Sequence, residues 1–186
     1  MDFRHKNTVR FFDYWLSLPK EKGVPLRSSF HPEKVAALLT HMMIYELLPT
    51  HRIKRRLLGS RLDQLGIGGA DHGALSSVVS GVGAGICGDG CSEEEDTARF
   101  WVLGTQPCGL LVMTPQALKS GLNVMVETLC LPLLADNGGK GQIIVQKNVL
   151  DDPAFNPDRD TFEPDPLPVV QCDFIDIGAG IPELKS

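Results

Sequence analysis

The apolar positions in the centre of the chain predict a two-stranded hairpin. Residues 122–150 contain two apolar runs on either side of a glycine-rich turn. Asn137-Gly138 in that turn is typical of a hairpin, because both residues accept positive φ at low cost. The first run is apolar on both faces, with Val126 on one and Leu129 on the other. Such a hairpin needs cover from other elements.

The same reading of periodicity assigns elements to most of the remaining chain. Helical patterns cover residues 8–18, 29–40, 60–66 and 93–103, with a further short helix within 71–80. Strand patterns cover residues 42–48, 52–58 and 109–113, besides the central hairpin. The order predicts an α+β fold: a five-stranded antiparallel sheet with helices on one face, an N-terminal amphipathic helix and an extended C-terminal tail.

Changes in composition divide the chain into three parts. Residues 1–24 form a helical extension that ends in a loop, and residues 25–150 hold the sheet. Residues 151–186 begin with an acidic stretch that contains five prolines, which is typical of extended chain. Residues 169–177 regain strand character, so we expect them to pair with an edge of their own sheet or of a partner's.

Composition and charge exclude some classes of function. The chain is 42% hydrophobic and 22% charged and has no 18-residue apolar run or signal peptide, so we expect a cytoplasmic protein without membrane contact. Residues 1–61 carry 12 Lys and Arg against 5 Asp and Glu, but the basic residues are scattered, which disfavours nucleic acid. Five cysteines without paired metal-ligand spacing indicate reduced thiols and no metal site.

Three short segments resemble a known family. They are Trp15 with Leu16 and Pro19, the junction RRLLGSRLDQLG at 55–66, and ETLCLPLLADNGG at 127–139. Together with the element order they resemble a PAS domain, and more narrowly a stand-alone PAS-like family widespread in alphaproteobacteria. The resemblance implies a sensor or protein-interaction module whose sheet and helices enclose a small-molecule pocket or form a dimer surface.

Residues expected on one face of that sheet are the candidates for a ligand pocket. Among them, the carboxylate Glu127 lies between apolar neighbours on a central strand, where it needs a partner. It either forms a structural ion pair, with Arg55 or Arg56, or anchors a ligand in the pocket. The full set of pocket candidates is Ile44, Trp101, Leu111, Met113, Met125, Glu127 and Ile144.

These observations favour a non-enzymatic sensory or adaptor module in bacterial signalling. It would bind an unknown small molecule, an unidentified signalling protein, or both, and no cofactor is predicted. We expect a homodimer, with the apolar side chains of the first helix as the contact: Val9, Phe12, Trp15 and Leu16.

Two alternatives remain open. One is a pure interaction or dimerisation module without a ligand. The other is a small enzyme that uses Asp71, His72 or Glu127, although no nucleophile motif accompanies them and no catalytic residue is assigned. A G-x-G-x-x-G match within the glycine-rich stretch 81–91 is a poor nucleotide site, because four acids at 93–96 would repel phosphate.

Overall fold

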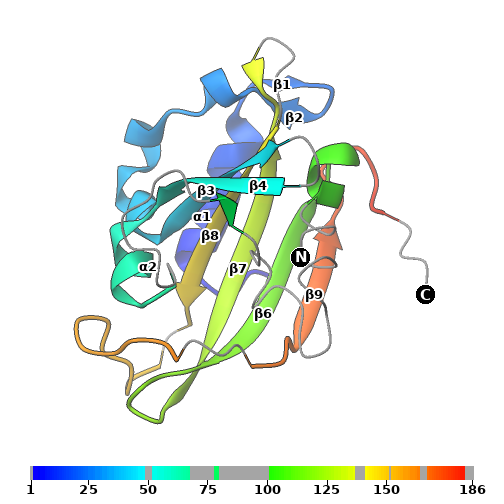
Figure 1. The fold of residues 1–186 in the computed structure, drawn as a ribbon. Coiled ribbons are helices and arrows are strands. Elements are labelled where there is room, and N and C mark those ends of the chain that lie inside the picture. Colours follow the sequence, from blue (N-terminus) through cyan, green and yellow to red (C-terminus); the bar gives the residue numbers. More distant parts are fainter. Residues whose placement is uncertain are drawn as a thin grey trace.

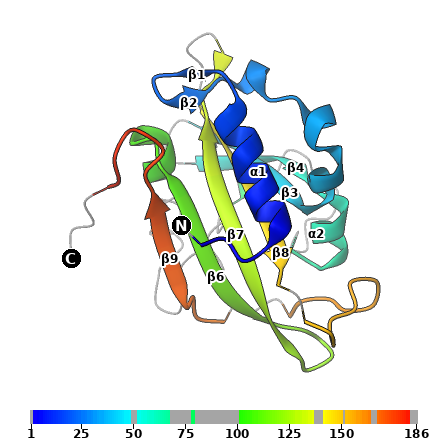
Figure 2. The same cartoon turned by 180° about the vertical axis from the view of Figure 1, so that it is seen from behind.

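The chain folds around one large antiparallel sheet, seen from its two sides in Figures 1 and 2. The computed structural model describes residues 2–48, 52–67, 78–79, 101–136, 141–150, 152–163 and 167–182. The strands are β3 (Met42–Leu48), β4 (Arg52–Leu58), β5 (Val78–Val79), β6 (Gly109–Ala117), β7 (Asn123–Leu133), β8 (Gln142–Val149) and β9 (Gln171–Ile175). Their order across the sheet is β5-β4-β3-β8-β7-β6-β9.

The predicted count of five strands is wrong. In the described chain the sheet has six strands of five or more residues, besides the two-residue β5. The additional strand is β9, which pairs antiparallel with β6 from Gly109↔Ile175 to Met113↔Gln171. The pairing satisfies the backbone groups of an edge strand that would otherwise face solvent. Of the two destinations expected for the tail strand, the structure places it on its own sheet.

The first helix, α1 (Lys6–Ser17), is close to its predicted range, but the next predicted helix is wound more tightly than the periodicity suggested. Residues 29–40, predicted as one α-helix, lie mainly in the 3₁₀ segment 32–41, which is kinked at Val35 and is preceded by a short 3₁₀ turn at 27–29. Residues 101–105 are helical, whereas residues 68–77 and 80–100 lie outside the described chain. The remaining elements are α1 (Lys6–Ser17), β1 (Lys20–Glu21), β2 (Val24–Pro25), η1 (Arg27–Ser29), η2 (Pro32–His41) and α2 (Ser60–Gln64).

Other elements cover both faces of the sheet, whereas the sequence predicted helices on one face only. Figure 2 shows α1 lying across β7 and β8, where Phe11 and Trp15 are fully buried with Leu129. On the opposite face, Leu103 of the 101–105 turn packs with Cys130. The physical reason is that the central strands are apolar on both faces, so each face has to be removed from water.

The junction between β4 and α2 depends on one glycine. The Gly59 backbone N–H donates to the Met42 carbonyl at 2.8 Å. A Cβ on Gly59 would lie 2.4 Å from the carbonyl oxygens of Leu39 and Thr40, closer than atoms can approach. Only glycine therefore lets the chain turn here, and the turn sets α2 against the end of η2. Gly66, with φ of +85°, ends the turn after α2 as the sequence predicted.

The tail contributes to the packing in its described part. Residues 152–163 have no regular helix, but Phe162 is buried and its N–H donates to the Leu65 carbonyl at 2.8 Å. Lys119 N–H donates to the Thr161 carbonyl at 2.9 Å, which fixes the tail to the β6–β7 turn. Within the described residues, no helix has the length and apolar character needed to cross a membrane.

Candidate functional site

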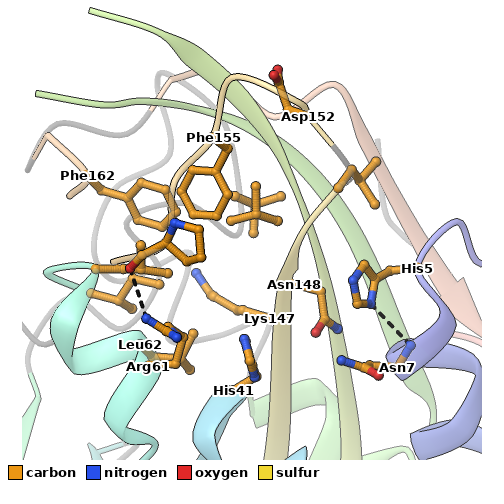
Figure 3. A pocket seen from close by; sticks show the side chains of 16 residues that line it. His5, Asn7, His41, Arg61, Leu62, Lys147, Asn148, Asp152, Phe155 and Phe162 are labelled. Atoms are coloured by element: carbon orange, nitrogen blue, oxygen red, sulfur yellow. Dashed lines mark hydrogen bonds between the residues drawn. The ribbon is translucent and has the colours of Figure 1, made fainter. Parts of the chain in front are cut away.

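A cavity of about 360 Å³ lies at the end of β8, where this strand extends beyond the neighbouring strand β3. The first residue of β3, Met42, pairs with Gln146, so Lys147 to Val149 have β7 on one side only. The space left by β3 is enclosed by the start of α1, the end of η2, α2 and the tail (Figure 3). Its lining residues are His5, Asn7, His41, Arg61, Leu62, Leu65, Ile67, Val126, Lys147, Asn148, Val149, Leu150, Asp152, Phe155, Pro157 and Phe162.

Arg61 fastens the tail over one side of this cavity. Its Nη1 donates to the Pro157 carbonyl at 2.9 Å and to Asp158 Oδ1 at 2.9 Å, and also to Gln64 Oε1 at 3.1 Å. Asp158 is largely exposed, so this ion pair adds little to stability by itself. Its effect is positional, because it holds Pro157 against α2 as part of the cavity wall.

The opposite side of the cavity depends on Glu127. This side chain is fully buried and accepts the Arg4 N–H at 2.7 Å and the His5 N–H at 3.1 Å. A buried carboxylate needs such donors, and bonds to a charged acceptor are the strong ones. Glu127 therefore has a structural role, but through backbone amides and not through the expected ion pair with Arg56. Arg56 pairs with Glu46 instead.

The segment that Glu127 holds also begins α1. The His5 Nδ1 accepts the Asn7 N–H at 3.1 Å, so an imidazole caps the helix. Acceptance requires Nδ1 to be without its proton in this arrangement. One turn later, the buried Thr8 Oγ1 accepts from Asn148 Nδ2 at 3.0 Å. The first residues of α1 are thus tied to the sheet beside the cavity that His5 and Asn7 line.

Two buried carboxamides beneath α1 have unmet hydrogen-bonding capacity in the described structure. They are Asn148, through Oδ1, and Gln146, through both Oε1 and Nε2. Each side chain is at most 1% exposed. Buried polar atoms without partners are rare in folded proteins and commonly mark a bound water, ion or ligand. Asn148 is also one of the residues that line the cavity.

Titratable groups give the cavity a basic character. Burial lowers the pKa of His41, and the Arg61 charge beside it and His5 act in the same direction. Burial also lowers the pKa of Lys147, with a smaller opposing contribution from Cys130. Figure 3 shows the Lys147 amine extending between Arg61 and the phenyl rings of Phe155 and Phe162.

None of the seven predicted pocket residues lines this cavity. Ile44, Leu111 and Ile144 belong to the core under α1, and Trp101 packs on the opposite face of the sheet. The other three share the face under α1: Glu127 and Met113 are buried, and Met125 is half-buried. The predicted face was thus filled by α1 itself, and the cavity formed at the end of the sheet.

The four predicted dimerisation residues divide between core and surface. Trp15 is fully buried in its own chain, where its Nε1 donates to the Pro132 carbonyl at 3.1 Å. Phe12 is half-buried against Phe3, with the ring centroids 5.0 Å apart. Val9 and Leu16 are 39% and 44% exposed. Only part of the predicted contact is therefore accessible to another molecule.

Sequence reasoning missed the polar residues of the actual cavity. A usable signal was present in IIVQKNVL, where Gln146, Lys147 and Asn148 interrupt an apolar strand on both of its faces. His5, His41 and Arg61 gave no local signal, because only the tertiary fold brings them together. Asp71 and His72, the candidates for an enzymatic pair, lie outside the described residues.

Other chemistry finds little support in the described residues. No three His, Cys, Asp or Glu side chains there are grouped to hold a metal ion. Burial raises the pKa of Cys108 to about 11 and that of Cys130 to about 12, which disfavours a reactive thiolate. A second cavity, of about 610 Å³, lies at the other end of β7, but its charged residues Glu21, Lys22 and Asp136 are all exposed.

Comparison with known proteins gives one match. A family model described as a PAS domain matches residues 3–72, which is less than half of the chain. The matched segment contains α1, η2, β3, β4 and α2, and supplies seven of the sixteen residues that line the cavity. No curated protein and no solved structure matches the chain. With the α+β fold around an antiparallel sheet, the match supports a PAS-like domain.

The substitution Glu127→Gln tests the role assigned to the buried carboxylate. We expect it to lower the free energy of unfolding by about 1–3 kcal/mol, because a neutral amide offers one acceptor and weaker bonds to the two amides. Hydrogen exchange at Arg4 and His5 should accelerate together. Glu46→Gln, which breaks the exposed pair with Arg56, serves as the control and should cost less than about 1 kcal/mol. Equal losses in the two variants would contradict this role.

Proposed function

We propose that this chain is a non-enzymatic PAS-like sensory or adaptor module that binds a small ligand in the cavity at the end of β8. We place its action in the cytoplasm of a bacterium, in signalling. The observation that carries the ligand is the cavity itself, where polar groups from four separate segments converge and the buried Asn148 Oδ1 has no partner. A concave space with an apolar lining and a few placed polar groups is typical of small-molecule sites.

We propose a non-enzymatic role because the buried carboxylate beside the cavity is engaged in structural hydrogen bonds. Both oxygens of Glu127 accept backbone amides, so the carboxylate is committed to structure. A general base must reach a substrate proton, and this one is covered by the N-terminal segment. Among the described cavity residues, Lys147 and Asn148 suit recognition, and none is a serine, threonine or cysteine that could act as a nucleophile.

A ligand in this cavity would act on α1. His5 and Asn7 line the cavity and also begin the helix, and the cap bond joins them. A ligand that contacts both residues would have different affinities for two conformations, one with the start of α1 docked on the sheet and one with it released. Such a difference in affinity shifts a conformational equilibrium. The outer face of α1 would then present the change to a partner.

A cavity-filling substitution tests the ligand-binding proposal. Val126→Phe adds a ring to a buried position on the cavity wall, whereas Val170→Phe adds the same ring at a position 62% exposed. In an amide NMR screen of small fragments, we expect hits that shift Lys147, Asn148 and Val149 in the wild type and in Val170→Phe. Val126→Phe should fold, as judged by its spectrum, and lose those shifts. A screen without any hit at these amides would count against the proposal.

A second candidate, an interaction module that forms a homodimer, is favoured by the surface of α1. Val9, Phe12 and Leu16 follow i, i+3, i+7 spacing, and the two outer members remain exposed. Isolated exposed apolar residues are ordinary, but a helical stripe is a common contact.

Size-exclusion chromatography with light scattering tests this second candidate. The wild type should elute as a dimer, and Leu16→Glu should shift it to the monomer mass, because a charge would be buried in the contact. Ser17→Glu places the same charge on the adjacent exposed position and should leave the dimer intact. A monomeric wild type at high concentration would refute the homodimer.

A further inference from the structure

Lys147 is the least explained charge in the described chain. It lies on β8 facing the cavity, and none of the described residues forms an ion pair or hydrogen bond with its amine. Lys147 is half-buried, and partial removal of an ammonium from water without a counter-charge is unfavourable, so its pKa is lowered. An anion beside the amine would favour the charged form and offset this cost.

Among the described lining residues, the permanent positive charge beside Lys147 is that of Arg61. The same space is lined by His41, whose pKa is lowered, and by His5, whose Nδ1 accepts a hydrogen bond. Figure 3 shows the Asp152 carboxylate at the rim, directed away from the lysine. Asp152 Oδ1 accepts the Ala154 N–H at 2.8 Å, which accounts for that direction. Among the described acids of the tail, Asp158 is exposed and pairs with Arg61.

The rest of the lining is apolar and close to the lysine. Phe155 and Phe162 lie beside the Lys147 amine in Figure 3, and Val126 and Leu62 complete that part of the wall. On the other side of the lysine, Asn148 presents the buried acceptor Oδ1, which has no partner. An occupant is therefore met by the Lys147 amine, an apolar surface and the polar side chain of Asn148.

The geometry points to a small organic anion as the ligand, with its carboxylate or phosphate group at Lys147 and its apolar part against Phe155 and Phe162. This inference rests on the proposed function, since it specifies the chemical class that the same cavity takes. The cavity volume of about 360 Å³ is within the range of small-molecule sites. A hydroxyl or amino group on the same ligand would find the acceptor at Asn148.

NMR titration of the full chain tests the charge of the ligand with three simple probes. These are benzoate, phenyl phosphate and benzyl alcohol, of which the last has a similar ring and no charge. We expect the two anions to shift the amides of Lys147 to Leu150 in a saturable manner. Both should bind at least tenfold more tightly than benzyl alcohol, and raised salt should weaken them.

Substitutions identify the lysine as the origin of that preference. Lys147→Met retains the length of the side chain without its charge and should reduce the affinity for benzoate at least tenfold. Lys147→Arg should restore most of it, which separates loss of charge from loss of fold. Lys119→Met removes an exposed lysine on the β6–β7 turn and should leave the affinity unchanged.

The outcomes separate this inference from the proposed function. If benzyl alcohol binds at the cavity amides as tightly as benzoate, or Lys147→Met binds benzoate like the wild type, the anionic class is refuted and a ligand cavity stands. If none of the three probes shifts these amides, the anionic class is refuted here too. The fragment screen with Val126→Phe then decides separately whether any ligand binds.

Discussion

The buried carboxylate of Glu127 is the constraint on which the rest of this structure depends. It lies on the central strand β7 and is 0% exposed, and the backbone amides of Arg4 and His5 satisfy it. Because a buried charge without donors is strongly unfavourable, the sheet requires the N-terminal segment to lie where it does. That position directs α1 across β7 and β8, where Trp15 completes the core.

This constraint also creates the candidate site. The segment held by Glu127 places His5 and Asn7 at the open end of β8, and the Gly59 turn places Arg61 opposite them. The tail closes the remaining side through its bonds to Arg61. Core packing, helix capping and cavity lining thus share the same few residues. The proposed sensory function would use this sharing to connect a ligand in the cavity to the surface of α1.

Much of the fold could be predicted from sequence, and most of the site could not. The antiparallel pairing of β7 with β8 followed from two apolar runs, although the predicted turn at Asn137-Gly138 lies outside the described residues. Gly66 follows the end of α2 with a positive φ, as its type suggests. The strand count was wrong because the pairing of β9 depends on a free edge of β6, which local pattern does not reveal. The pocket residues were assigned to the face of Leu111 and Ile144, which is filled by α1. The cavity arose where β3 stops short of β8, a difference in strand length that only the assembled sheet shows.

The central claim is that the cavity and the start of α1 form one coupled unit. Hydrogen exchange measured residue by residue, with and without saturating benzoate, tests it most directly. The account predicts slower exchange at Lys147 to Leu150 and, in the same samples, a changed rate at the amides of His5 to Val9. Bound benzoate that protects the β8 amides and leaves the exchange of residues 5–9 unchanged would contradict it.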